Sequence, residues 1–436
     1  MPLEVAAFAE HFFRHEYGRL VALLTKSLGV RQLDLIDDAV QSAFSKGLQS
    51  WARTGIPDDP SGWLYRTARN LAIDSFRRQQ VEMRVLKTAG EDCLVRATLS
   101  PDLDVSFDSE IGDETLRLLF LCCHPTIPLE SGIALALKVV GGFGTEEIAN
   151  SLLISKSNTE KRLTRAKENL RERGTEIIEL NAAAIAERAA SVLSTIYLMF
   201  TEGYVATVGE DSIREQLCDE AIRLARMLNA NPWSSSPTTA ALLGLMLLQA
   251  SRQHARVDAD GCIILLTDQD RTAWNFDLIR EAMGWMTQAA IGPELSRYHI
   301  EAAIAWEHAR AESTDAVDWN RVVGFYQKLS TMHPGPMVRL NLIIAQSRML
   351  GAEFALNALE NVSDDDRKRL RPWWDCAIAD AFEQLSRPSE AIAHLNDALA
   401  LSANAAQRRL IEQKLARLQN TLHALCFDAN EGRKSM

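Results

Sequence analysis

The stretch GGFGTEEIANSLLISKSNTEKRLTRAKENLRER, residues 141–173, predicts a short helix, a tight turn and a longer basic helix. Thr145 is a favourable N-cap for the first helix, and Ser155 can cap the second. The apolar residues of the second helix recur at three- and four-residue spacing, at Leu163, Ala166 and Leu170. From Ser155 to Arg173, seven lysines and arginines stand against three glutamates, so this amphipathic helix has a net charge of +4.

Two interpretations of this stretch have about equal weight on charge and spacing alone. A short helix followed by a basic amphipathic one is the pattern of a helix-turn-helix, whose second helix lies in the major groove of DNA. The alternative is a solvated helix of a helical bundle, because basic helices are common in such folds. The choice between them depends on the rest of the chain.

The whole chain of 436 residues is acidic, with a net charge of −11, and 47% of its residues are apolar. This length allows two to four domains with sizeable buried cores. An acidic protein repels DNA, so any DNA contact must be made by a local basic patch. We therefore expect the isolated protein to bind duplex DNA poorly at physiological salt.

Seven cysteines without a C-x-x-C pair indicate reduced thiols in a cytoplasmic protein. Cys122, Cys123 and His124 are adjacent, but neighbouring cysteines on an apolar helix more often belong to a core than to a metal site. We expect no metal and no cofactor. The N-terminal segment MPLEVAAFAEHFF is typical of an amphipathic helix rather than a signal peptide, and no apolar run is expected to span a bilayer.

The first 80 residues predict two helices, a loop and a basic helix. The helix over residues 33–50 has an outer face with Asp34, Asp37, Asp38 and Gln41. The loop WARTGIPDDPSG, residues 51–62, contains two prolines and two glycines. The next helix begins at Trp63 and carries arginines beside aromatic residues, which suits single-stranded DNA because bases stack on aromatic rings. Taken alone, such a helix is more often part of a core.

Residues 83–110 lose the helical period and become acidic, which predicts a linker. Residues 184–436 predict helices almost throughout, apart from a small hairpin with its turn at 258–261. Two helix pairs, at residues 337–355 and 374–392, resemble each other. Their period is close to the tetratricopeptide repeat of about 34 residues, and such repeats form concave binding surfaces.

The motif Asp268-Gln269-Asp270-Arg271 could be interpreted as paired carboxylates for acid–base catalysis. No nucleophile, glycine-rich loop or metal spacing accompanies it in the sequence. A structural network of salt bridges and caps is therefore favoured for Asp268, Asp270 and Arg271 over a catalytic site.

Residues 10–80 resemble the second conserved region of bacterial RNA polymerase sigma factors. The resemblance rests on DDAVQSAF, residues 37–44, and on the segment from Trp63 to Arg78. It implies that core RNA polymerase docks on Asp37, Asp38, Gln41 and Phe44. It also implies that the promoter −10 element is melted and read by Trp63, Arg66, Arg69, Asn70, Arg77 and Arg78.

Residues 113–175 look like the fourth conserved region of the same factors, through EEIA at 146–149 and RLTRAK at 162–167. This resemblance implies that the promoter −35 element is read by Lys156, Lys161, Arg162, Arg165 and Lys167. Glu160 stands where the family often has lysine, which weakens the basic surface there. The two regions follow each other across a short linker, which is the layout of the extracytoplasmic-function (ECF) type.

The rest of the chain resembles the ECF subgroup with a tetratricopeptide-like C-terminal extension. The matching motifs are FLCCHP at 120–125, FTEGY at 200–204, EAIRLAR at 220–226, DQDR at 268–271 and DW at 318–319. The resemblance implies that regulation is built into the protein, so an anti-sigma factor is not implied as a partner.

These observations predict an all-α fold with two small helical sigma domains, the second a helix-turn-helix, and a large helical C-terminal domain. The predicted boundaries are 1–82, 111–178, 184–290 and 291–436. We expect a transcription initiation factor that is not an enzyme and whose partners are core RNA polymerase and promoter DNA, with no particular oligomeric state implied. The alternative is a helix-turn-helix regulator that binds DNA alone and uses its C-terminal half as a sensor.

Overall fold

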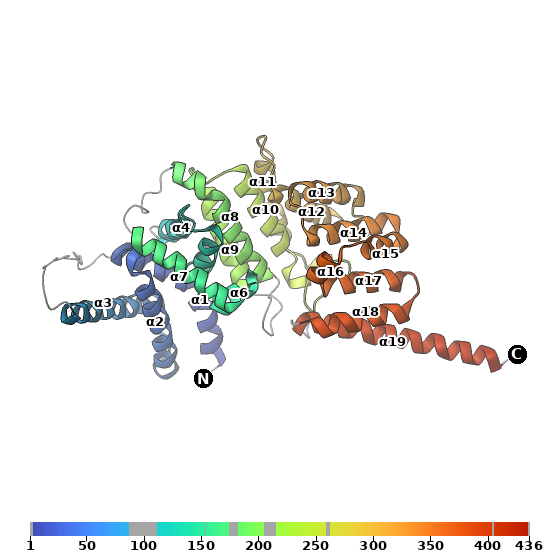
Figure 1. Cartoon of the computed structure of the whole chain (residues 1–436), viewed down its shortest axis with the longest axis horizontal. Coiled ribbons are helices and arrows are strands. Elements are labelled where there is room, and N and C mark those ends of the chain that lie inside the picture. The colour runs from blue at the N-terminus through green and yellow to red at the C-terminus, as the bar shows by residue number, and fades with distance from the viewer. Residues whose placement is uncertain are drawn as a thin grey trace. The chain divides into compact units, whose positions relative to one another are not determined.

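The structure is a computed structural model, and it describes residues 3–86, 111–152, 154–173, 182–204, 215–258, 262–402 and 405–434. Within these residues the chain is helical and has no strand, which confirms the predicted all-α fold (Figure 1). The predicted hairpin is reduced to one antiparallel bridge between Val257 and Ile263. The predicted linker at 83–110 lies outside the described residues from residue 87 on.

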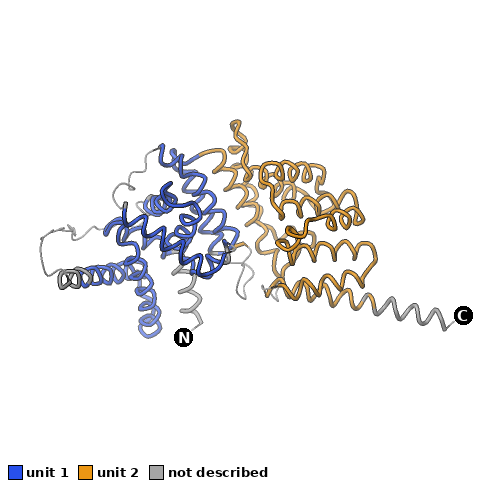
Figure 2. The backbone as a smooth tube through the Cα atoms, in the orientation of Figure 1, with its two compact units in different colours: residues 1–202, 215–235 blue, residues 203–214, 236–436 orange. Residues whose placement is uncertain are grey.

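The chain divides into two compact units (Figure 2). Unit 1 comprises residues 1–202 and 215–235, and unit 2 comprises residues 203–214 and 236–436. Each unit is described by itself below.

Unit 1 begins with three long helices, α1 (Leu3–Leu28), α2 (Leu33–Thr54) and α3 (Pro60–Leu86). A 3-10 turn, η1 (Val30–Gln32), joins α1 to α2. Helix α2 packs on both α1 and α3, and Leu24, Ile36 and Leu64 between them are fully buried. Each of these three helices therefore contributes an apolar face to one shared core.

Four shorter helices follow, α4 (Ile111–Cys122), α5 (Leu129–Val139), α6 (Thr145–Ser151) and α7 (Lys156–Arg173). The predicted apolar stripe of α7 is confirmed, because Leu163, Ala166 and Leu170 are all buried. Ser155 Oγ accepts a hydrogen bond from the backbone N of Asn158 at 3.2 Å, as expected of an N-cap.

The N-cap predicted for α6 is wrong by one residue. Helix α6 begins at Thr145, and the preceding Gly144 accepts the bond from the backbone N of Ile148. The backbone N of Gly144 in turn donates to Glu147 Oε2 at 2.7 Å. Glu147, in the first turn of α6, therefore satisfies the backbone N–H of Gly144, and this helix end is capped without a side chain at the N-cap position.

Helices α8 (Ala182–Tyr204) and α9 (Glu215–Ala230) complete the core of unit 1, and α8 runs to the boundary with unit 2. Arg188 of α8 is 4% exposed and donates through Nη1 to the carbonyl of Phe120 at 3.2 Å. Cys122 and Cys123 are buried and free, and burial raises the pKa of the Cys123 thiol to about 12. These cysteines are core residues, as predicted from their apolar neighbours.

The expectation that no apolar run could span a bilayer needs correction. Residues 183–204, within α8, are long and apolar enough to cross a membrane by length and composition alone. The same helix buries Val192, Ile196 and Phe200 in the core of unit 1. It is therefore a core helix and does not indicate a membrane protein.

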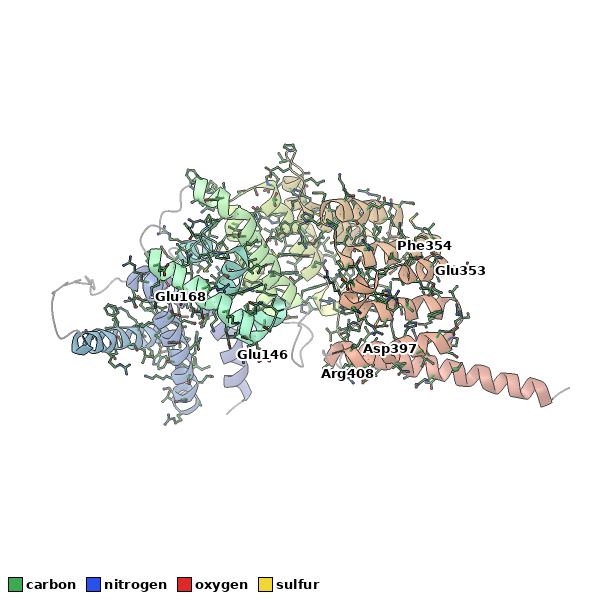
Figure 3. All side chains as sticks on the ribbon, viewed as in Figure 1. Glu146, Glu168, Glu353, Phe354, Asp397 and Arg408 are labelled. Atoms are coloured by element: carbon green, nitrogen blue, oxygen red, sulfur yellow. The ribbon has the colours of Figure 1, made fainter. Side chains whose placement is uncertain are left out.

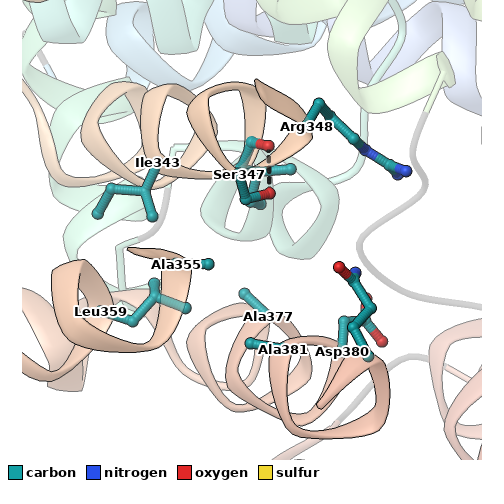
Figure 4. Close-up of a pocket in the computed structure, with 10 residues that line it drawn as sticks. Ile343, Ser347, Arg348, Ala355, Leu359, Ala377, Asp380 and Ala381 are labelled. Atoms are coloured by element: carbon teal, nitrogen blue, oxygen red, sulfur yellow. Dashed lines mark hydrogen bonds between the residues drawn. The ribbon is translucent and has the colours of Figure 1, made fainter. Parts of the chain in front are cut away.

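Unit 2 is a series of helices in which most successive members are packed neighbours, whereas α16 packs on α14 and α17 (Figure 1). They are α10 (Pro237–Ala250), α11 (Phe276–Ala289), α12 (Arg297–Arg310), α13 (Trp319–Met332), α14 (Pro336–Leu350), α15 (Ala352–Glu360), α16 (Asp364–Leu370), α17 (Trp373–Gln384), α18 (Pro388–Leu401) and α19 (Ala405–Lys434). The two segments predicted to resemble each other form the neighbouring pairs α14–α15 and α17–α18. A small pocket between α14, α15 and α17, about 70 Å³, is lined by Ile343, Ala355 and Ala381 among others (Figure 4).

Candidate functional site

The acidic face of α2 is centred on Asp37, which is only 4% exposed. Its Oδ1 accepts hydrogen bonds from Tyr17 Oη of α1 and, at 3.1 Å, from Gln41 Nε2 one turn further along α2. Its Oδ2 lies 3.4 Å from Lys167 Nζ of α7. These partners compensate for the hydration that a carboxylate loses when it is this deeply buried.

The four predicted docking residues do not share one environment. Phe44 is buried and its ring stacks on Tyr17, with centroids 6.0 Å apart. Asp37, Gln41 and Phe44 lie on one side of α2 around that tyrosine, because they are spaced by four and three residues. Asp38 is exposed, and partial desolvation together with the charge of Asp37 raises the pKa of its carboxyl.

The basic edge predicted on α3 faces solvent. Arg66, Asn70, Arg77 and Arg78 are exposed, whereas Arg69 and Trp63 are half-buried. Trp63 packs edge-on against Trp51 of α2 at 5.5 Å, which fixes the start of α3. Arg66 lies 3.7 Å from Asp59, an exposed pair of little energetic value. Most of this edge is therefore available to a polyanion.

The basic residues of α7 fall into two groups. Lys156, Lys161 and Arg165 are exposed, and none of them forms an ion pair among the described residues. Arg162 pairs with Glu130 of α5, and its side chain is 18% exposed. Figure 3 marks Glu168, an exposed acid on the same helix. Lys156, Lys161 and Arg165 are therefore the residues of α7 that can contact a phosphate without breaking an existing ion pair.

Lys167 differs from the other predicted DNA contacts, because it points at α2. Its Nζ lies 2.8 Å from Asp34 Oδ1 and 3.4 Å from Asp37 Oδ2, and its side chain is 18% exposed. At about 100° per residue, Lys167 lies about 200° around the helix from Arg165, next to the apolar stripe. The prediction that Asp34 and Asp37 both lie on the outer face of α2 is confirmed for Asp34, which is 60% exposed, and is wrong for Asp37, which is buried against Tyr17.

The DQDR motif lies in unit 2, next to the 3-10 turn η3 (Arg271–Ala273). Asp270 is exposed and caps that turn by accepting from the backbone N of Thr272 at 2.9 Å. Hydrogen bonds from Thr272 lower the pKa of Asp270. Gln269 Nε2 donates to the carbonyl of Ile264 at 3.0 Å.

Arg271 reaches the end of α12, where Nη1 donates to the carbonyls of Ala311, at 2.9 Å, and His308. Its guanidinium also lies over the ring of Trp274. The salt bridge expected between the acids of the motif and Arg271 is not formed among the described residues. The motif instead connects two segments through caps and carbonyl contacts.

One group in unit 2 has metal-ligand geometry, formed by Asp375, His394 and Asp397, the last of which is labelled in Figure 3. Arg371 forks onto Asp375 at 2.7 and 2.9 Å and reaches Asp397 at 3.3 Å. The guanidinium therefore already supplies the positive charge that a metal would bring to these carboxylates.

Comparison with known proteins places these features in a family. A family model described as sigma-70 region 2 matches residues 12–82, which are α1 to α3. A second model, described as a family of unknown function (DUF6596), matches residues 188–290. An uncharacterized protein of Rhizobium meliloti (strain 1021) is 38% identical over 397 residues, covering 89% of this chain and 91% of its own length.

No solved structure matches the chain. The region 2 match covers both the acidic face of α2 and the basic edge of α3, so the two surfaces belong to one known domain. That domain supports a role in transcription initiation. The chain carries sigma-70 region 2 at its N-terminal end and belongs to the same family as the Rhizobium meliloti protein.

Proposed function

We propose that this protein is an ECF-type sigma factor that brings core RNA polymerase to specific promoters and initiates transcription. The observation that carries the proposal is the region 2 match over α1 to α3, which contains both the docking motif and the melting motif. The exposed edge of Arg66, Asn70, Arg77 and Arg78 supports a contact with the −10 strand. On the neighbouring helix α2, the exposed carboxylate of Asp38 is available to the polymerase.

In this proposal, α6 and α7 form the helix-turn-helix that reads the −35 element. Lys161 and Arg165 are one turn apart on the exposed side of α7, where both can reach the major groove. The helices of unit 2 act as a tetratricopeptide-like regulatory extension, which their serial packing supports. The protein works in the cytoplasm, needs no cofactor and has no enzymatic activity of its own.

The test is capture of the full-length protein by immobilised core RNA polymerase, followed by run-off transcription from genomic promoter fragments. We expect promoter-dependent transcripts only when core enzyme and this protein are both present. Asp38→Lys reverses an exposed docking charge and is expected to weaken capture by about tenfold, or about 1.4 kcal/mol. Asp365→Lys makes the same charge change at an exposed position on α16 and serves as the matched control.

A regulator that binds DNA alone would give a different pattern. It would shift promoter duplex without polymerase and would not confer initiation on core enzyme. Equal capture of Asp38→Lys and Asp365→Lys would mean that Asp38 of α2 is not part of the surface that docks polymerase. Absence of transcripts from every fragment, together with no capture by core enzyme, would overturn the proposed function.

A further inference from the structure

We infer that unit 1 holds the protein in a closed, self-inhibited state, in which Lys167 of α7 is paired with Asp34 and Asp37 on the docking face of α2, while Asp38 stays exposed. Lys167, one of the predicted DNA contacts, is the residue that closes it. The inference rests on the proposed function, because it concerns how the two proposed binding surfaces are regulated. It names a regulator that is part of the same chain.

The ion pair between the two surfaces is enclosed at Lys167 and Asp37, whereas Asp34 is 60% exposed. Lys167 Nζ joins Asp34 and Asp37 at 2.8 and 3.4 Å, and the side chains of Lys167 and Asp37 are 18% and 5% exposed. Burial by itself would lower the pKa of Lys167, but hydrogen bonds and charges from Asp34 and Asp37 outweigh it and raise the pKa. The lysine is therefore charged and paired with two carboxylates of α2.

A second contact, between the backbones of α1 and the end of α5, accompanies this ion pair. A Cβ at Gly18 would lie 2.1 Å from the carbonyl oxygen of Val140, at the end of α5. Backbone cannot move aside like a flexible side chain, so only glycine allows α1 to approach this closely. The closed arrangement thus depends on a residue that is in neither proposed binding surface.

Tyr17, the neighbour of Gly18, links this contact to the ion pair. On one side its ring lies 3.3 Å from the position of a Cβ at Gly142, which has a φ of +68°. On the other side its hydroxyl donates to Asp37. A third connection joins Lys26 of α1 to Glu114 of α4 at 3.2 Å. The first three helices are therefore held to α4–α7 at several independent points.

The closed state is incompatible with the proposed activity. Lys167 cannot pair with Asp37 and contact a promoter phosphate at the same time. Two promoter elements about 25 base pairs apart lie about 85 Å apart along DNA at about 3.4 Å per base pair. In the structure, α7 instead contacts α2, the direct neighbour of α3.

The chain between the two parts is long enough for them to separate. Residues 87–110 join α3 to α4, and a chain of that length reaches at most about 80 Å. Together with the width of the helical parts, this reach allows α3 and α7 to bind the two elements at once. Opening therefore requires the loss of the contacts at Lys167, Gly18, Tyr17 and Lys26, together with the packing of α1 on α4.

The first experiment examines closure without polymerase or DNA. A carbodiimide cross-linker of zero length joins a carboxylate and an amine with loss of water, so it can join Asp34 to Lys167 across 2.8 Å. We expect peptide mass spectrometry of the full-length protein to find this cross-link, and its yield to fall several-fold in Gly18→Ala. Gly284→Ala, on α11 with open space around the new Cβ, is the matched control and should retain the yield.

The second experiment asks whether closure inhibits. If the open form is about a tenth of the population, Gly18→Ala should bind core polymerase up to about tenfold more tightly, or about 1.4 kcal/mol. Lys167→Gln should do the same, whereas Lys328→Gln, which removes an exposed lysine on α13, should not. Core polymerase added to the wild-type protein should suppress the cross-link.

The outcomes separate this inference from the proposed function. Absence of the cross-link in the wild-type protein overturns the closed state. A cross-link that persists at saturating polymerase, with equal affinity for wild type and Gly18→Ala, overturns inhibition. Failure of every variant to bind core enzyme overturns the proposed function and with it the inhibitory role, whatever the cross-link shows.

Discussion

The pair between Lys167 and Asp37 can be measured energetically with a double-mutant cycle. The cycle uses Lys167→Met, Asp37→Asn and the double variant in the full-length protein. Removing one partner of a buried pair costs about 3–5 kcal/mol when the other charge is left alone. Asp37 would keep its hydrogen bonds from Tyr17 and Gln41, so we expect Lys167→Met to cost about 2 kcal/mol.

Asp37→Asn leaves Lys167 its second partner, Asp34, whose side chain is 60% exposed. An exposed partner contributes little, so we expect this variant to cost about 1–2 kcal/mol. Each single variant removes the ion pair between Lys167 and Asp37, and the double variant removes the same ion pair. Its cost should therefore be smaller than the sum of the single costs, by a coupling free energy of about 1–2 kcal/mol.

The assay is urea unfolding of the full-length protein, with hydrogen exchange of α2 peptides to assign the transition of unit 1. Lys161→Met is the control, because this lysine is exposed and should cost less than about 0.5 kcal/mol. The pKa of Lys167 in the folded protein is raised above 10.5. The contribution of Lys167 to the free energy of unfolding is therefore complete below the pKa of the unfolded state, and it is lost as pH rises through the raised value. The difference between wild type and Lys167→Met should thus persist from about pH 7 to about pH 10.

Additive costs in the cycle would contradict this account, since they would mean that the two side chains do not interact in the folded protein. The same conclusion would follow if Lys161→Met were as destabilising as Lys167→Met. Either result would also remove the ion pair from the closed state.

Three further predictions concern other parts of the chain. Phe120→Ala should destabilise unit 1 by about 3–5 kcal/mol in chemical unfolding, because the ring is 1% exposed and its loss leaves a cavity. Burial and nearby arginines lower the pKa of His308 to about 4. The free energy of unfolding of unit 2 should therefore fall, by at most about 3 kcal/mol, as pH drops from about 6.5 towards 4. Thermal unfolding of His308→Asn should not show this pH dependence. Arg165→Ala should weaken footprinting of the −35 element by the holoenzyme about tenfold, and Arg162→Ala should weaken it less because Arg162 already pairs with Glu130.

Local features of the chain could be predicted because they depend on neighbours in sequence. The stripe of Leu163, Ala166 and Leu170 and the cap at Ser155 follow from helical periodicity and from side-chain chemistry within one turn. The buried state of Cys122 and Cys123 follows from the apolar residues that surround them. In each case the signal that decides the prediction lies within a few residues in the sequence.

The features that could not be predicted depend on residues far apart in the chain. Lys167 and Asp37 are separated by 130 positions, and nothing in either segment marks the other as its partner. A lysine beside an apolar stripe fits a phosphate contact and a buried ion pair equally well in sequence. Similarly, Arg271 was expected to pair with the acids of its own motif, but it donates to the carbonyls of His308 and Ala311, which follow 37 and 40 residues later.

In the proposed function, acidic side chains of α2 bind polymerase and basic side chains of α7 bind DNA. Because these side chains have opposite charge and belong to one chain, they can also bind each other. Lys167 of α7 and the acids of α2 belong to one chain, which raises their local concentration relative to a separate partner. A flat, fully exposed pairing would be weak and would be screened by salt. Here Asp37 is enclosed by Tyr17 and Gln41, and Gly18 brings the backbones into contact, so closure does not depend on exposed charges alone. In the proposed closed state, the acids of α2 that are proposed to dock polymerase also hold Lys167 of α7, so polymerase binding and release of α7 are expected to be coupled.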